Sequence, residues 1–125
     1  MLISREQLPA GAQYVIRSYG DDHVTVNEHS LRQSFFLSPA TLHTDWPPAT
    51  SDELTTAHLD SLLALEPEVV LLGTGPVLNH PGVELLGHVM QQNVGIEVMD
   101  TPAACRSYNI LLNEDRRVVV GFLLG

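Results

Sequence analysis

The fold is decided by one stretch, Val69-Val70-Leu71-Leu72-Gly73-Thr74-Gly75-Pro76. Four consecutive apolar residues that begin with a β-branched pair are typical of a strand buried on both faces. The glycines that follow let the backbone turn sharply, and at least one of them is expected to adopt a positive φ. The stretch therefore predicts a central strand that ends in a tight loop.

A second unit repeats this plan. Residues 96–99 (IEVM) predict another strand, and residues 100–102 (DTP) open a helix. One helix joins the two strands, so residues 69–99 predict a right-handed βαβ unit. We expect its strands to be parallel, adjacent or nearly so, and largely buried. Their carboxyl ends then meet at one edge of the sheet, where open α/β sheets form a ligand crevice.

The length and charge of the chain limit its class. With 125 residues and a hydrophobic fraction of 44%, the chain is predicted to fold as a single domain over residues 1–125. Six basic residues against fifteen acidic ones give a net charge of −9. Nucleic acids and anionic membranes need a basic face, so neither is expected as a partner.

The distribution of cysteine and apolar residues predicts a cytoplasmic protein. The single Cys105 excludes an internal disulfide and a cysteine-rich zinc site. The first residues lack the basic and apolar segments of a secretory signal. No apolar run approaches the roughly 18 residues that span a bilayer, so membrane insertion is not expected.

The first third of the chain predicts an antiparallel meander. Residues 14–19, 23–27 and 31–37 are strand-like segments, and polar turn residues separate them. Residues 38–51 contain three prolines and no helical period, which predicts a loop. Trp46 is expected to hold this loop against the body of the protein, because an indole rarely stays in water.

Three helices and a closing strand are expected in the rest. Either Thr55 or Thr56 can cap the helix that carries Leu59, Leu62 and Leu63. A second helix is expected to begin at Pro81. A third follows Pro102, with Thr101 as its N-cap, and residues 117–124 form the closing strand. The predicted apolar face of the second helix consists of Val83, Leu86, Val89 and Met90.

The Gly73-Thr74-Gly75 triplet has two interpretations. It lacks the third glycine of the dinucleotide fingerprint and the Gly-Lys-Ser/Thr ending of a P-loop. A tight exit from a buried strand explains it without a ligand. A loop for a small anion or polar ligand is the alternative, because backbone amides at such corners can hold anions.

The Asp100–Arg106 stretch also has two interpretations, a structural one and a chemical one. Asp100 and Thr101 suit a helix N-terminus, where an acidic side chain and a capping hydroxyl are stabilising. Cys105 lies about one turn into the helix, where the dipole and Arg106 favour a thiolate. A small cysteine among alanines is, however, typical of core packing. A nucleophile also needs a base and an oxyanion hole, and the sequence identifies neither.

The six histidines show no metal-binding spacing, so no metal and no cofactor is predicted. The chain likewise contains no GxSxG nucleophile elbow. A complete set of catalytic residues is therefore not recognisable.

Three segments carry a family resemblance: residues 71–75 (LLGTG), 94–101 (VGIEVMDT) and 103–109 (AACRSYN). With them, the chain resembles the small domain shared by uncharacterised bacterial proteins and mitochondrial complex I assembly factor 3. The resemblance extends through residues 14–37 and Trp46, over nearly the whole chain. It implies a three-layer α/β fold, with a mixed central sheet and an additional small antiparallel β layer at the N-terminal side.

For function, the resemblance implies a family without an established enzymatic activity, whose best-known member assists the assembly of a respiratory complex. The first hypothesis is therefore a non-enzymatic binding or assembly-assisting protein with a protein partner. The alternative is a small enzyme or a binding protein for a small polar or anionic ligand. It would use the crevice between the Gly73-Thr74-Gly75 loop, here called the glycine loop, and the helix start at Asp100–Arg106. The residues that the resemblance places there are Gly73, Thr74, Gly75, Asp100, Thr101, Cys105 and Arg106.

Overall fold

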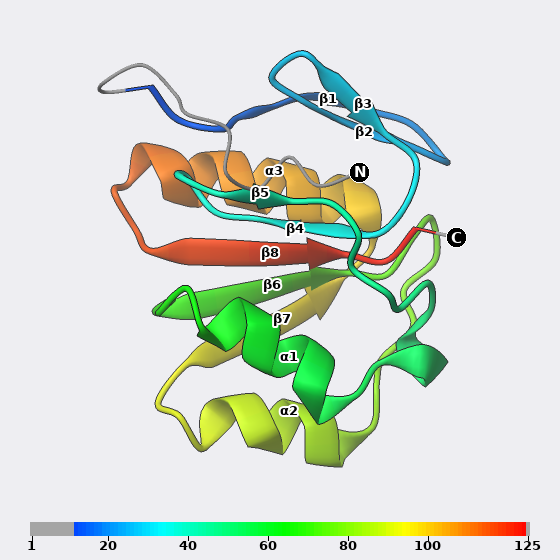
Figure 1. The fold of residues 1–125 in the computed structure, drawn as a ribbon, viewed down its shortest axis with the longest axis vertical. Helices are drawn as coiled ribbons and strands as arrows, with labels where there is room; N and C mark the ends of the chain where they lie inside the picture. The colour runs from blue at the N-terminus through cyan, green and yellow to red at the C-terminus, as the bar shows by residue number, and fades with distance from the viewer. Residues whose placement is uncertain (1–11, 125) are drawn as a thin grey trace.

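The computed structural model describes residues 12–124, which form two β-sheets and the helices that cover the larger one (Figure 1). The strands are β1 (Ile16–Tyr19), β2 (Val24–Val26), β3 (His29–Leu31), β4 (Phe35–Leu37), β5 (Leu42–His43), β6 (Val69–Gly73), β7 (Gly95–Met99) and β8 (Val118–Phe122). The helices are α1 (Thr56–Leu63), α2 (Val83–Met90) and α3 (Thr101–Asn113), and a 3₁₀ turn, η1, spans Ser51–Glu53.

The central sheet is mixed, as expected. Its strand order is β5-β4-β8-β6-β7. Strands β8, β6 and β7 are parallel, and β4 pairs antiparallel with both of its neighbours, β8 and β5. The smaller sheet is antiparallel, in the order β1-β2-β3. The three-layer α/β prediction is therefore confirmed.

The two faces of the central sheet hold two separate apolar clusters. Along β6, Val69 and Leu71 pack in the cluster beneath α3 and the small sheet, whereas Val70 and Leu72 pack beneath α1 and α2. Figure 1 shows α3 between the two sheets and the other two helices on the opposite side. This double coverage explains why the sequence of β6 is a continuous apolar run instead of an alternating one.

The parallel pairing of β6 and β7 confirms the predicted βαβ unit, and Val70 is fully buried. The expected burial of residues 96–99 is wrong. Strand β7 forms the edge of the sheet, its Glu97 side chain is exposed, and Ile96, Val98 and Met99 are only half-buried. A strand with one neighbour has one side open, whatever its apolar content.

The expected strand over residues 31–37 is also wrong, because the chain changes sheets within it. Strand β3 ends at Leu31 in the small sheet, and β4 begins at Phe35 in the central sheet. Between them, the buried hydroxyl of Ser34 donates to the carbonyl of Leu124 at 3.1 Å and accepts from its amide at 2.9 Å. These bonds connect the crossing point to the end of β8.

The predicted loop over residues 38–51 contains the short strand β5, which pairs with β4. Trp46 is buried, as expected, with 4% of its surface exposed. Its indole packs edge-on against Phe36, and its Nε1 donates to the carbonyl of His58 at 3.3 Å. The tryptophan therefore connects this segment to α1.

Helix α2 departs from prediction in two ways. It begins at Val83 after Gly82, so Pro81 lies before the helix and not at its first position. Val83 and Met90 are exposed, whereas Val89 is buried. The helix has only eight residues and lies against α1 and the edge strand β7, so only a narrow stripe of it meets the core.

Candidate functional site

The end of β6 and the start of α3 contact each other directly. The amide of Thr101 donates to the carbonyl of Gly75 at 2.8 Å, and the Thr101 hydroxyl accepts from the Gly75 amide at 3.0 Å. Gly75 has a φ of 95°, which confirms that a glycine of the triplet takes a positive φ. These bonds join the two segments between which the sequence predicts a crevice. Thr101 itself is buried.

Asp100, and not Thr101, caps α3. Its carboxylate accepts a hydrogen bond from the amide of Ala103 at 2.9 Å, and Thr101 is the first helical residue. The prediction of Thr101 as the N-cap is therefore wrong, although both residue types suit that position. The Thr101 hydroxyl is bound to the Gly75 amide, which leaves the capping position to Asp100.

The other two predicted site residues of α3 point in different directions. Cys105 is buried in the cluster that lies beneath the small sheet. Burial raises the pKa of its thiol to about 12, and the positive charge of Arg106 lowers this pKa by less than burial raises it. The exposed Arg106 donates from Nη1 to the Tyr19 hydroxyl at 3.1 Å and so connects α3 to β1. The structure does not bring these two side chains together with Thr74.

The buried thiol predicts low reactivity. In the folded protein, we expect iodoacetamide to modify Cys105 much more slowly than in urea-unfolded protein across pH 7–9, because the thiolate is the reacting form. Mass spectrometry of the alkylated protein over time measures both rates. Equal rates in the two states, or fast modification with an apparent pKa below the free-thiol value of about 8.5, would contradict this expectation.

Thr74 organises the loop that follows β6. Its hydroxyl donates to the carbonyl of Val77 at 2.9 Å and accepts from the amide of Asn79 at 3.0 Å. The Ser51 hydroxyl donates to the carbonyl of Asn79 at 2.6 Å, which connects the loop to η1. These bonds hold the loop in one shape while the side chains of Val77 and Leu78 remain 73% and 48% exposed.

Two adjoining cavities flank this loop at the carboxyl edge of the sheet; together we call them the edge groove. One, of about 310 Å³, lies between the Asp21–Asp22 turn and the glycine loop, with Leu123 and Leu124 in its lining. The other, of about 430 Å³, lies between η1 and residues 77–79. Thr50, Thr74 and Pro76 are among the residues that line both cavities.

Of the predicted site residues, Thr74 and Gly75 line the edge groove. Sequence analysis missed Val77 and Leu78, as well as the contribution of the Asp21–Asp22 turn. One signal was available: an apolar pair in a segment between Pro76 and Asn79 that belongs to no periodic element. No rule of periodicity assigns such a pair to a core.

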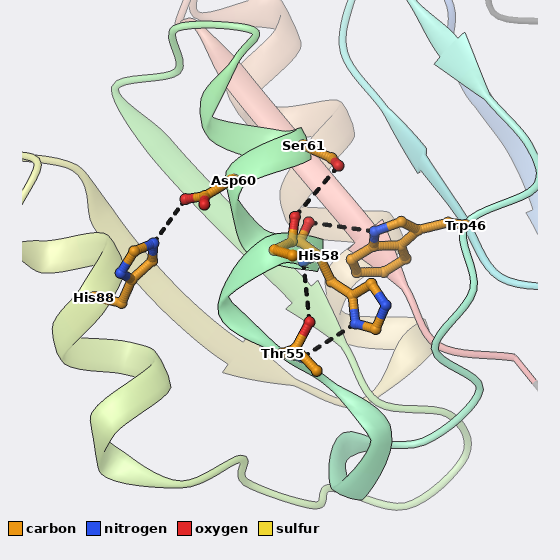
Figure 2. Close-up of polar contacts among 7 residues, drawn as sticks. Trp46, Thr55, His58, Asp60, Ser61 and His88 are labelled. Carbon is orange, nitrogen blue, oxygen red and sulfur yellow. Dashed lines mark hydrogen bonds and ion pairs between the residues drawn. The ribbon is translucent and has the colours of Figure 1, made fainter.

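On the face of the central sheet opposite α3, polar contacts of α1 have structural roles (Figure 2). The Thr55 hydroxyl accepts from the His58 amide at 3.3 Å, and Nδ1 of His58 accepts from the Thr55 amide at 3.1 Å. This reciprocal pair identifies Thr55 as the N-cap of α1. Between helices, Nε2 of His88 lies 2.7 Å from the Asp60 carboxylate.

Within residues 12–124, no cluster of three or more histidine, cysteine or acidic side chains could hold a metal ion. The same residues include no helix long and apolar enough to cross a bilayer.

The chain belongs to a family of small α/β proteins, the one described as "Protein of unknown function (DUF498/DUF598)", which matches residues 16–123. Among its relatives is NADH dehydrogenase [ubiquinone] 1 alpha subcomplex assembly factor 3 of Danio rerio, which is 32% identical over 91% of this chain and 66% of its own length. A "13 kDa major membrane protein" of Francisella tularensis is 37% identical over half of each chain. The chain thus spans about half to two thirds of the length of these curated relatives.

Solved structures confirm the family fold. An NMR structure from Xanthomonas campestris matches with a TM-score of 0.85 at 38% identity, over 97% of this chain and 92% of the other. A crystal structure from Bordetella parapertussis matches with a TM-score of 0.86 at 36% identity, over 94% of this chain and all of the other.

Proposed function

We propose that the protein is a non-enzymatic binding protein that assists the assembly of a larger protein complex, and that it contacts its partner through the loop of residues 76–79. The observation that carries this proposal is the loop itself. Hydrogen bonds to Thr74 and Ser51 fix its backbone, yet its two aliphatic side chains face solvent. A loop whose backbone is already fixed loses less conformational entropy on binding, so less of the free energy from its apolar contacts is offset.

Similarity to complex I assembly factor 3 supports the assembly role, since the matched region covers 91% of this chain. The surroundings of Cys105 support binding over turnover. With a pKa raised to about 12, its thiol is protonated at neutral pH and is a poor nucleophile.

The proposal keeps three expectations from the sequence: a cytoplasmic location, no nucleic-acid partner, and no bound cofactor. The net charge of −9 supports the second of these, because phosphate backbones bind basic surfaces. Thr101 and Arg106 contribute to the proposal indirectly, through the hydrogen bonds that hold α3 against the glycine loop and β1. Asp100 contributes by capping the first turn of α3.

Affinity capture from the source cells tests the proposal with two variants. The double variant Val77→Ser, Leu78→Ser removes the exposed aliphatic groups of the loop. Ile110→Ser is the matched control, because Ile110 is an exposed aliphatic residue of α3 that does not line the edge groove. We expect wild type and Ile110→Ser to recover the same defined protein, and the double variant to recover at least about tenfold less, the equivalent of about 1.4 kcal/mol.

If the double variant recovered as much of the partner protein as the wild type, the proposed contact through residues 76–79 would be wrong. Reproducible turnover of a small metabolite by the purified protein, together with no recovered partner, would contradict the binding role itself. Melting temperatures of all three proteins serve as a folding control, since exposed side chains contribute little to stability.

A further inference from the structure

We infer that the edge groove binds a short segment of the partner protein that carries arginine or lysine at one end and aliphatic side chains at the other. This inference rests on the proposed function and adds to it the chemistry of the segment that is recognised. It also assigns an orientation, in which the basic side chains meet the Asp21–Asp22 turn and the aliphatic ones meet Val77 and Leu78.

The acidic end of the groove is the turn between β1 and β2. Asp21 and Asp22 line the cavity of about 310 Å³, and both are exposed. Asp22 pairs with Arg32 at 2.7 Å and with His23 at 3.1 Å. These two partners hold the pKa of the Asp22 carboxyl below its usual value, so it stays ionised at neutral pH.

Asp21 makes no ion pair with any residue of the described part of the chain. Its carboxylate is therefore available to a cation from a partner. Arg32 does not line either cavity of the groove, and its guanidinium is engaged by Asp22.

The apolar end of the groove lies beyond Thr74. There Pro76, Val77 and Leu78 line the second cavity, to which Ala49 also contributes apolar surface. Leu123 and Leu124, which follow β8, contribute apolar surface to the first cavity. Because Thr50, Thr74 and Pro76 line both cavities, one extended segment could contact the two ends in succession.

Charge complementarity decides the sign of the occupant. Among the described residues that line the groove, none is basic. Asp52 and Glu53, on η1 directly after the lining residue Ser51, add further negative charge. The adjacent pair Arg116 and Arg117 precedes β8, and it therefore lies at the opposite, amino end of the parallel strands. A cleft lined by charge of one sign concentrates ligands of the other sign.

A phage-displayed random peptide library, selected on the immobilised full chain, provides the test. We expect the selected peptides to be enriched in arginine or lysine on one side of aliphatic residues. A synthetic peptide of the selected sequence is then titrated against wild type, Asp21→Asn, the Val77→Ser, Leu78→Ser double variant, and Asp115→Asn. Asp115→Asn is the charge-matched control at the amino end of the sheet, and asparagine tolerates its positive φ of 59°.

We expect Asp21→Asn to weaken binding about three- to tenfold and the loop double variant at least about tenfold, with Asp115→Asn within about twofold of wild type. Affinity for wild type should also fall as salt rises, because exposed charges are screened. Exchanging the two ends of the peptide should weaken binding, since the orientation places cations at the turn.

Several outcomes would overturn the inference: no enrichment, enrichment of acidic or wholly apolar peptides, or equal loss of affinity in Asp21→Asn and Asp115→Asn. If spermidine competed for the groove as strongly as the peptide does, the groove would be only a nonspecific surface for cations, and the inference would be wrong. These results are distinguishable from failure of the proposed function. If affinity capture recovers a partner that depends on Val77 and Leu78, the binding role stands and only the cationic chemistry of the segment is wrong.

Discussion

Replacing Trp46 with alanine is expected to lower the free energy of unfolding by about 3–5 kcal/mol, the usual cost of removing a large buried aromatic side chain. The indole packs at 80° to the Phe36 ring, with the centroids 6.0 Å apart, and it lies similarly against the His58 imidazole. Its NH group donates to the backbone of α1, as Figure 2 shows. The substitution thus leaves a cavity between the sheet and α1.

The backbone of Gly121 in β8 shows how closely the tryptophan is packed. A Cβ at this position would lie 2.6 Å from Cη2 of the Trp46 ring. Any side chain at residue 121 would therefore displace the indole. The cavity left by alanine has β8 on one side and α1 on the other, and packed structure around such a cavity relaxes only partially.

Urea unfolding followed by circular dichroism measures this effect. Trp46→Phe is the control, because it keeps an aromatic ring and loses only the NH group and part of the volume; we expect a smaller loss of about 1–2 kcal/mol. A loss below about 1 kcal/mol for Trp46→Ala would mean that the segment before α1 is not held by this residue.

Gly73→Ala is expected to destabilise the protein by about 1–3 kcal/mol, the range for adding a methyl group to a packed core. A Cβ at Gly73 would lie 2.9 Å from Cδ1 of Phe122 and 3.1 Å from the Cβ of Ala104. The last residue of β6 therefore lets α3 and β8 approach closely. Accommodating the methyl group requires movement of a buried ring or of the helix.

Gly87→Ala in α2 is the matched control. A Cβ at this helical glycine would meet no atom within 4 Å beyond the adjacent backbone of its own helix. Alanine in a helix interior is favoured over glycine by roughly 0.5–1 kcal/mol, so we expect this variant to gain stability. Differential scanning calorimetry of the two variants makes the comparison. A melting temperature of Gly73→Ala equal to or above that of Gly87→Ala would contradict the close packing at β6.

The candidate site was only partly predictable. The glycine loop could be found because a buried apolar run followed by Gly-x-Gly is a local signal, and Thr74 and Gly75 do line the edge groove. The Thr101 hydroxyl accepts its hydrogen bond from the amide of Gly75, twenty-six residues earlier in the chain. A sequence shows that a threonine can donate and accept, but not which distant group will satisfy it.

Local periodicity by itself determined that this protein is an α/β fold with a parallel βαβ unit. These signals are local: the apolar run of β6, the apolar residues of β7 and the capping residues between them. Each acts over a short stretch of chain, so each can be recognised from the sequence alone. The resemblance of these same segments also determined the family, which the matches over most of the chain confirm.

The tertiary structure alone decided which strands have two neighbours and which apolar side chains remain in solvent. The break between Leu31 and Phe35 and the open side of β7 follow from how two sheets are assembled, and sequence patterns do not encode which sheet a strand joins. The Thr74 hydroxyl bonds the loop backbone in a conformation that leaves the side chains of Val77 and Leu78 exposed. Burial depends on contacts between residues distant in sequence, and only the folded chain creates them.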